Sequence, residues 1–242
     1  MTPQVLPYKD IPDSKKSQVR RMFDGIAHRY DFLNHFLSFG IDQTWRKKAI
    51  RRLKIYKPDT ILDIATGTGD FAIAALKISP TRVIGVDISQ EMLNIGIEKI
   101  KHAKLTGKIN FALADAENLP FPDDSFDAAT CAFGVRNFEN PLLGLTEIYR
   151  VLKPGGKLVI LEFSNPARFP FRYFYRLYFH TLLPLLGKWI SKDKSAYNYL
   201  PESVSLFPQG EKFLEILKGA GFTNPSVSLL SFGIVSLYFA ER

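Results

Sequence analysis

Two segments indicate the fold most clearly: Ile61-Leu-Asp-Ile-Ala-Thr-Gly-Thr-Gly-Asp70 and, further along the chain, Val83-Ile-Gly-Val-Asp-Ile-Ser89. An apolar run leads into a Gly-x-Gly turn, a helical pattern comes next, and a second apolar run ends in Asp87. Glycine lets a backbone approach a ligand closely, and the N-terminus of the following helix offers free N–H groups. An acid about 20 residues further on can accept both hydroxyls of a ribose, and Gly69 and Asp87 are 18 residues apart. The pattern predicts a nucleoside-containing cofactor held by Gly67, Gly69 and Asp87.

Strand-like and helix-like segments alternate through the middle of the chain. Strands that are separated by helices require right-handed crossovers, which produce a parallel sheet covered on both faces. Ligands of such sheets bind beyond the carboxyl ends of the strands. The expected strands are 60–64, 82–87, 109–114, 126–132 and 157–163, and the expected helices are 70–78, 90–102 and 140–152.

The two ends of the chain depart from this alternation. Residues 15–57 have a helical pattern, with a second helix expected to start at about Asp42 as its N-cap. After Phe163 the segment 165–200 contains ten aromatic residues. The runs 226–231 and 234–240 are separated only by two residues, which predicts a hairpin and an antiparallel last strand. We expect an N-terminal helical segment, 1–57, within the same domain as a cofactor-binding region, 58–242, that carries an aromatic insertion at 165–200.

Composition limits the class of protein. The chain has 242 residues, 46% of them hydrophobic, which suits one α/β domain. Its single cysteine and the lack of a long apolar run predict a cytoplasmic protein. The net charge of +8 comes from residues 1–58, which hold 13 Lys and Arg against 5 Asp. Such a segment could meet an anionic membrane or nucleic acid, or form a solvated helix face.

Two acids favour S-adenosylmethionine as the cofactor. The motif Gly67-x-Gly69-x-x-Ala72 also fits a dinucleotide site, so a nicotinamide-dependent dehydrogenase is an alternative. Asp63, before the turn, can hold the cationic methionine part, whereas it would repel a pyrophosphate. Asp115-Ala116 can accept from the adenine amino group and donate a backbone N–H to a ring nitrogen. No cluster with metal-ligand spacing occurs, and we expect no metal.

The order of these elements resembles the class I methyltransferases throughout 58–242, which implies a Rossmann-like, seven-stranded, mostly parallel sheet with an antiparallel last strand. From Val19 onward the chain also resembles the ubiquinone/menaquinone biosynthesis C-methyltransferase family. The motifs that carry this resemblance are Tyr30-Asp-Phe-Leu-Asn34, Ser38-Phe-Gly40, Trp45-Arg46, Phe133-Gly-Val-Arg-Asn137, Arg150-Val-Leu-Lys-Pro-Gly-Gly156 and Leu161-Glu-Phe-Ser164.

The resemblance implies an activity: C-methylation of a polyprenylated quinol. Demethylmenaquinol is the favoured acceptor because menaquinone synthesis is the family's most widespread role, and a benzoquinol of ubiquinone synthesis is the alternative. The family's cofactor contacts fall on Thr68, Asp87 and Asp115-Ala116. A serine that some members use for a further contact is replaced by Ala132.

The resemblance also assigns substrate residues. Arg136 is expected to stabilise a quinolate and Asn137 to position it, while Tyr30, Asp31 or His28 completes a proton path. The alternative for Arg136 is a purely structural ion pair, and for His28 a surface or capping role is the favoured interpretation.

Two further features suit a lipid-tailed substrate. The aromatic insertion could form an apolar slot, and the basic N-terminal segment could provide peripheral contact with anionic lipid. A nucleic-acid methyltransferase is a rival interpretation of the basic segment. Methyltransferases that act on exocyclic nitrogens of bases usually carry an Asn/Asp-Pro-Pro-aromatic motif after the fourth strand, where this chain has Phe133–Asn137. We therefore expect no nucleic-acid partner, and the sequence is silent on the oligomeric state.

Overall fold

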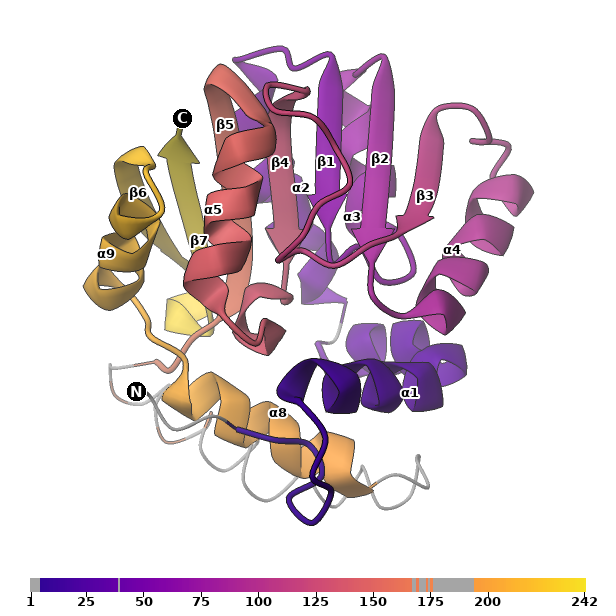
Figure 1. The fold of residues 1–242 in the computed structure, drawn as a ribbon, viewed down its shortest axis with the longest axis vertical. Helices are drawn as coiled ribbons and strands as arrows, with labels where there is room; N and C mark the ends of the chain where they lie inside the picture. The colour runs from indigo at the N-terminus through magenta and orange to yellow at the C-terminus, as the bar shows by residue number, and fades with distance from the viewer. Residues whose placement is uncertain (1–4, 39, 167–168, 170–172, 174, 176–193) are drawn as a thin grey trace.

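The computed structural model describes residues 5–38, 40–166, 169, 173, 175 and 194–242. Its centre is a seven-stranded sheet in the order β3-β2-β1-β4-β5-β7-β6 (Figure 1). The strands are β1 (Thr60–Ile64), β2 (Arg82–Asp87), β3 (Ile109–Leu113), β4 (Phe126–Ala132), β5 (Leu152–Phe163), β6 (Thr223–Leu230) and β7 (Val235–Glu241).

The direction of the strands agrees with the class I methyltransferase fold that the sequence predicted. The pairs β1–β2, β1–β4, β2–β3 and β4–β5 are parallel. Only β7 runs against its neighbours, since it is antiparallel to both β5 and β6. A 3₁₀ turn, η4 (Ser231–Gly233), joins β6 to β7, so the predicted hairpin is confirmed.

Helices cover both faces of the sheet. In Figure 1, α2 and α3 lie behind it, and α5 and α9 lie in front. The helices are α1 (Lys15–Leu37), α2 (Ile41–Lys54), α3 (Asp70–Ala75), α4 (Gln90–His102), α5 (Pro141–Val151), α8 (Lys194–Leu206) and α9 (Glu211–Gly219), with the 3₁₀ turns η1 (Leu76–Ile78) and η2 (Val135–Asn137).

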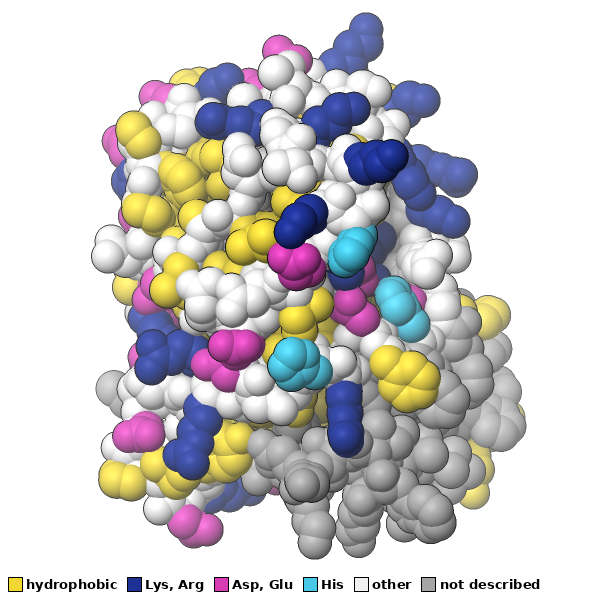
Figure 2. Space-filling model, turned by 90° about the vertical axis from the view of Figure 1, so that its right-hand side faces the viewer, with side chains coloured by type: hydrophobic (Ala, Val, Ile, Leu, Met, Phe, Trp, Pro, Cys, Tyr) yellow, Lys and Arg dark blue, Asp and Glu magenta, His cyan; other side chains and the backbone are white. Residues whose placement is uncertain are grey.

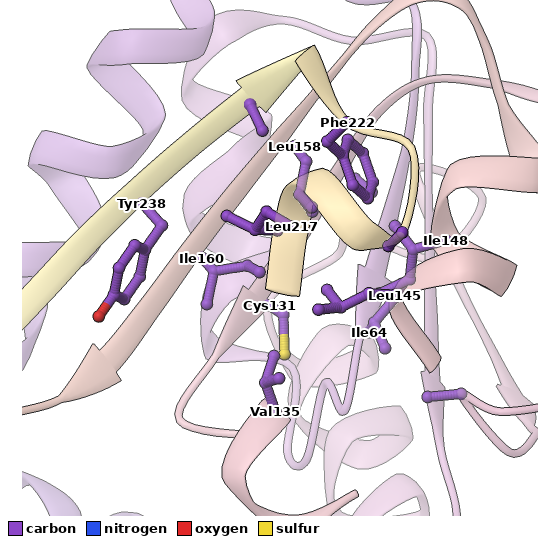
Figure 3. Packing of buried hydrophobic residues seen from close by; sticks show 14 of the residues in the cluster. Ile64, Cys131, Val135, Leu145, Ile148, Leu158, Ile160, Leu217, Phe222 and Tyr238 are labelled. Carbon is purple, nitrogen blue, oxygen red and sulfur yellow. The ribbon is translucent and has the colours of Figure 1, made fainter. Parts of the chain in front are cut away.

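Apolar side chains fill the space between the sheet and each helical layer. On the α5 and α9 side, Leu145 and Ile148 pack with Leu217 against Ile64 and Ile160 (Figure 3). On the other side, α2, α3 and α4 contribute a second buried cluster, which includes Trp45, Leu53, Phe71 and Ile100. The single cysteine, Cys131, is buried in the first cluster as a core residue.

Three local expectations were wrong. Asp42 is not the N-cap of α2, because Gly40 holds that position with φ of 72° and Asp42 lies in the first turn. The predicted helix 70–78 is divided into α3 and η1. The strand that we expected to start at Lys157 starts at Leu152, which pairs with Phe126 of β4. The next residue of β5 that pairs with β4 is Lys157, opposite Ala128. The Lys153–Gly156 turn therefore forms a bulge inside β5.

The aromatic insertion is described only in part. The aromatic and apolar residues with helical spacing in this segment, and the arginines between them, lie outside the described residues: Phe171, Phe174, Tyr178, Leu182, Arg168, Arg172 and Arg176. Tyr175 and Tyr199 are described, and both are buried. Tyr199 belongs to α8 and packs with Val19 and Met22 of α1.

The arrangement at the carboxyl ends of the strands positions the site. In Figure 1, α1 and α8 lie below the sheet, at the end to which the parallel strands point. Because every loop after a parallel strand leaves at this edge, the glycine turn, Asp87 and Asp115 face α1 there. Within the described ranges, no helix combines the length and the apolar character that a membrane span requires.

We predict that Gly85→Ala destabilises this sheet. A Cβ at Gly85 of β2 would lie 2.6 Å from Cδ1 of Phe111 and 2.8 Å from Oγ1 of Thr66. Such overpacking costs about 1–3 kcal/mol of unfolding free energy, which urea denaturation measures. Gly25→Ala in α1 is the matched control, because nothing lies within 4 Å of its Cβ position and alanine favours a helix interior by about 1 kcal/mol. Equal stability of the two variants would contradict the packing described for Phe111.

Candidate active site

A cavity of about 650 Å³, counting the part that is open to solvent, lies between α1 and the carboxyl ends of β1 to β4. Ligand pockets of α/β proteins commonly lie at this edge of the sheet. It gathers residues that are far apart in the sequence. Six of the ten predicted site residues line it: Tyr30, Gly67, Asp87, Asp115, Ala116 and Asn137.

The glycine turn is held open by backbone conformation. Gly67 has φ of 56° and Gly69 has φ of 86°, both in the left-handed region that favours glycine. A Cβ at Gly67 would meet only Tyr30 Cε1, at 3.7 Å, so this glycine faces the cavity. A Cβ at Gly69 would lie 2.5 Å from Cζ of Phe111. Gly69 is therefore required for packing and is not among the cavity-lining residues.

Asp87 is bound to the turn that precedes it. Its Oδ2 accepts the Gly67 N–H at 2.8 Å and its Oδ1 accepts the Ser89 N–H at 2.9 Å. Burial, with a contribution from the negative charge of Asp24, raises the pKa of Asp87 to about 6. A carboxylate has about four lone-pair sites, so two remain for ligand hydroxyls. This geometry fits the ribose of S-adenosylmethionine.

Asp115 and Ala116 lie at the next strand end along the sheet. Asp115 Oδ1 accepts the Glu117 N–H at 2.9 Å, and Asp115 Oδ2 pairs with Lys16 of α1 at 2.5 Å. Lys16 also pairs with Glu117 at 3.2 Å. Both Asp115 and Ala116 line the cavity beside Asp87, which suits an adenine attached to that ribose.

Asp63 lies behind the cavity and does not line it. The carboxylate is fully buried and accepts hydrogen bonds from Thr66 Oγ1 and Thr130 Oγ1, each at 2.6 Å. Burial raises the pKa of Asp63 to about 6. Its direct contact with the methionine part of a cofactor stays a prediction, and the observed role of the carboxylate is to bind these two threonine hydroxyls.

Thr68 faces away from the cavity, towards α1 and α4. Its hydroxyl donates to Asp31, and Lys99 donates to the same hydroxyl at 3.0 Å. Lys99 also pairs with Asp31 at 2.6 Å and with Asp70 at 2.8 Å. This polar cluster ties α1 to the glycine turn, so the cofactor contact expected of Thr68 stays a prediction.

A second polar cluster contains His35, Asp42 and Asp70, whose ligand atoms lie within 4.8 Å of one another. Sequence spacing did not reveal this grouping, because the three residues come from α1, α2 and α3. Arg46 pairs with Asp42, and Lys99 pairs with Asp70. Because each carboxylate already has a cationic partner, the grouping is explained by helix packing without a metal.

Arg136 of η2 forms a buried ion pair with Glu162 of β5. Its Nη1 lies 2.7 Å from Oε1 of Glu162, with the two side chains 8% and 0% exposed. The guanidinium also donates to the Phe133 carbonyl, and the Arg136 N–H donates to Glu162 at 3.2 Å. Arg136 does not line the cavity. The charge of Glu162 outweighs the effect of burial and raises the pKa of Arg136.

Asn137 lines the cavity and is held by two protein groups. Its Nδ2 donates to the Phe133 carbonyl at 3.3 Å, and its Oδ1 accepts from the Tyr199 hydroxyl at 3.0 Å. The buried ammonium group of Lys15, from α1, donates to two carbonyls of the same turn, that of Arg136 at 2.9 Å and that of Phe138 at 2.7 Å. Burial, together with the charge of Arg136, lowers the pKa of Lys15 to about 8. These contacts fix the η2 turn from both α1 and α8.

Of the three residues proposed for a proton path, only Tyr30 lines the cavity. His28 is exposed on α1, and Asp31 is bound to Thr68 and Lys99. Burial raises the pKa of Tyr30, whose hydroxyl lies within hydrogen-bond reach of Asn34. The hydroxyl therefore stays protonated at neutral pH.

Sequence reasoning missed several of these groups. Lys16 and Lys15 looked like ordinary first-turn lysines, and Tyr199 was one aromatic among ten. Glu162 stood inside the Leu161–Ser164 motif but carried no assigned role. Glu162 lies between Leu161 and Phe163 in an apolar strand, and this position was the signal that could have indicated a partner of opposite charge. An unpaired carboxylate inside a buried strand is costly.

Comparison with known sequences identifies relatives over nearly the full chain. A sequence model of the ubiE/COQ5 methyltransferase family matches residues 11–242. A protein of Bacteroides fragilis named demethylmenaquinone methyltransferase is 51% identical over 99% of this chain and 98% of its own. A protein of Geotalea daltonii named ubiquinone/menaquinone biosynthesis C-methyltransferase UbiE is 47% identical over 94% of this chain and 97% of its own.

Solved structures agree on the fold. A SAM-dependent methyltransferase of Thermotoga maritima matches with a TM-score of 0.65 and 21% identity, over 92% of this chain and 99% of its own. A Methanococcus maripaludis protein described as a putative S-adenosyl-L-methionine-dependent methyltransferase matches with a TM-score of 0.61 and 21% identity, over 97% of each chain. At this identity the likeness supports the class I fold alone.

We predict that cofactor affinity falls as the pH drops through 6. An acid with a pKa of about 6 is ionised in roughly a tenth of molecules at pH 5, so S-adenosylhomocysteine should bind about tenfold more weakly there than at pH 7. Asp24→Asn removes a negative neighbour of Asp87, lowers the pKa of Asp87, and moves the midpoint to lower pH. Calorimetric titration at several pH values measures the effect, with the exposed Asp59→Asn as control. A midpoint near 4 in the unmodified protein, or one that Asp24→Asn leaves unchanged, would contradict this role of Asp87.

We predict that Arg136→Ala destabilises the fold by about 3–5 kcal/mol, because it leaves Glu162 buried without its partner. The double variant Arg136→Ala/Glu162→Gln removes that charge and should recover part of the loss. Urea denaturation of both variants at pH 7 makes the comparison. If the single variant is as stable as the unmodified protein, Arg136 does not compensate the buried charge.

Proposed function

The chain belongs to the ubiE/COQ5 methyltransferase family, and from that premise we propose that it transfers a methyl group from S-adenosylmethionine to a ring carbon of a polyprenylated quinol. Demethylmenaquinol is the favoured acceptor. Relatives from Bacteroides fragilis, Porphyromonas gingivalis and Deinococcus radiodurans, at 51%, 44% and 42% identity, carry the name demethylmenaquinone methyltransferase. A benzoquinol is the second candidate because other relatives are named for both quinones.

One observation supports the proposal: a single cavity is lined both by acids that could bind a nucleoside and by side chains that could donate hydrogen bonds to an acceptor. Asp87 and Asp115-Ala116 lie on the cofactor side, and Tyr30 and Asn137 line the same cavity. Holding two reactants in alignment can supply about 7–11 kcal/mol of the barrier. A nicotinamide-dependent dehydrogenase does not require Asp115-Ala116, and no relative described above carries such a name.

The residues on the cofactor side are proposed to bind and orient. S-adenosylmethionine supplies a methyl group on a positively charged sulfur when bound. Asp87 would accept the ribose hydroxyls with the lone pairs that Gly67 and Ser89 leave. Asp115 would accept from the adenine amino group, and for this the carboxylate must share or release Lys16 of α1.

The acceptor reacts through the ring carbon next to a hydroxyl. Loss of the hydroxyl proton raises the electron density at that carbon, which then attacks the methyl carbon in line. A C–C bond forms, the S–C bond breaks, and its electron pair stays on sulfur. The ring carbon finally releases its own proton, which restores the aromatic ring. Donors that stabilise the quinolate oxygen lower the barrier of such a step.

Tyr30 and Asn137 are the proposed donors. The Tyr30 phenol is protonated at neutral pH, and Asn137 has a second N–H beyond the one that binds the Phe133 carbonyl. Arg136 is proposed to act from behind the cavity, because its guanidinium is bound to Glu162 and to the Phe133 carbonyl. Its positive charge stabilises a quinolate at a distance, and its contacts hold the η2 turn. The aromatic insertion remains our proposed location for the isoprenoid tail.

Product analysis tests the proposal. We expect mass spectrometry to show one added CH₂ on reduced demethylmenaquinone when protein and S-adenosylmethionine are present, and less product from the demethylated benzoquinol. Methyl transfer to neither quinol would refute the proposed function. The same incubation with NAD in place of S-adenosylmethionine is the control for hydride transfer.

We predict that Tyr30→Phe lowers kcat about 10²-fold, the usual effect of losing one oxyanion donor, while S-adenosylhomocysteine affinity stays within a factor of about two. The phenylalanine ring preserves the edge contact of Tyr30 with Phe23, whose ring centroids lie 5.9 Å apart. Single-turnover kinetics and calorimetry measure the two quantities. Undiminished turnover would show that the Tyr30 hydroxyl has no part in the chemistry.

A further inference from the structure

Helix α1 presents two opposite faces. Lys16, Val19, Phe23 and Tyr30 line the cavity. Their spacing places them on one side of a helix, and the same periodicity places Arg21, Gly25, His28 and Phe32 on the other. All four of these residues are exposed, Phe32 to 60%. On the side that α1 covers, the thickness of this helix, about 10 Å, lies between the cavity and these exposed residues.

Lys15 and Lys16 bind the η2 turn and the strand ends, and the acids and arginines of α1 are divided between its two sides. The acids of α1 point inward: Asp24 accepts from the Ser89 hydroxyl at 2.6 Å, and Asp31 pairs with Lys99 at 2.6 Å. The arginines Arg20, Arg21 and Arg29 are exposed. We call the residues Arg21, His28, Arg29 and Phe32 the outer face of α1. Arginines beside an exposed aromatic ring are typical of helices that lie on anionic lipid.

A second basic surface lies on α2. Lys47, Lys48, Arg51 and Lys54 are exposed there, and Ile55 follows with 74% exposure. In Figure 2, Lys and Arg side chains gather towards the top and right-hand edge, the side that corresponds to the back of the sheet in Figure 1.

The direction of α2 carries this surface away from the cavity. The helix begins near the end of α1, and its last turn connects to Thr60, the first residue of β1. Thr60 lies at the opposite end of the strand from the glycine turn. A membrane in contact with Lys54 and Ile55 would therefore lie at the far end of the molecule from the site.

We propose that the outer face of α1, and not the more strongly basic α2, is the surface that meets an anionic lipid bilayer. This inference rests on the proposed function, since an acceptor with an isoprenoid tail resides in lipid. With the outer face of α1 on the membrane, the cavity lies one helix thickness from the headgroups. The charge of α2 then faces the aqueous side.

Vesicle flotation with matched variants tests the proposal. Arg29→Glu/Phe32→Ser alters the outer face of α1, and Lys48→Glu/Ile55→Ser makes the same change of charge and removes one exposed apolar side chain at α2. With vesicles of phosphatidylcholine and phosphatidylglycerol, we expect the α1 variant to bind about tenfold more weakly than the unmodified protein. The α2 variant should bind within a factor of about two of it.

Activity on two forms of the acceptor provides the second measurement. Both variants should methylate a short-chain, water-soluble demethylmenaquinol at the unmodified rate, which also shows that they are folded. Only the α1 variant should lose turnover, about tenfold, on a long-chain acceptor in those vesicles. If the unmodified protein methylates neither form of the acceptor, the proposed function is refuted. Flotation would still measure whether the outer face of α1 binds the vesicles.

Three results would overturn the proposal. The first is binding of the α1 variant that equals that of the unmodified protein. The second is an equal loss in both variants, which would indicate a response to net charge alone. The third is no flotation of the unmodified protein, or equal flotation with pure phosphatidylcholine, which would point to an acidic protein partner or to apolar contact without charge.

Discussion

The carboxylate of Asp87, bound by the N–H groups of Gly67 and Ser89, is the constraint on which the site depends. β1 and β2 are parallel neighbours, so the glycine turn and Asp87 leave the sheet at the same edge. The hydrogen bond from Gly67 holds the turn open while the carboxylate keeps lone pairs for a ligand. The cost is that the carboxylate is partly withdrawn from water, which raises the pKa of Asp87 to about 6. A group that is expensive to bury and is retained at a strand end is typical of functional sites.

The second constraint is the position of α1 over that edge. Its inward acids and Lys16 bind the strand ends, while Lys15 binds the carbonyls of the η2 turn. The helix therefore links the residues that we propose to bind the cofactor with the turn that we propose to contact the acceptor. Because Lys16 pairs with Asp115, binding of an adenine at Asp115 would be coupled to the position of α1. With one side α1 can therefore form a wall of the site, and with its outer face it can contact a lipid surface.

Much of the fold could be predicted from the sequence because its signals are local. The bounds of β1, β2 and β4 follow from apolar runs that end at turns, and α4 follows from its Ser89 cap and its 3.6-residue period. The site was less predictable. Arg136 with Glu162 and Tyr199 with Asn137 are contacts between residues 26 and 62 positions apart. Such pairings depend on how strands and helices pack, and the sequence pattern does not specify them. Thr68 and Asp63 could likewise be recognised from the sequence as candidate site residues. That their side chains bind other protein groups and do not line the cavity depends on packing, and the sequence did not predict it.

Hydrogen–deuterium exchange of the full chain, with and without S-adenosylhomocysteine, tests whether the cofactor binds between α1 and the carboxyl ends of the strands. We expect slower exchange in residues 65–69, 87–92 and 115–117, and also in residues 15–31 of α1, because the ligand would lie between that helix and the strand ends. Protection confined to other segments, or protection of the strand ends with unchanged exchange in α1, would contradict this position of the cofactor.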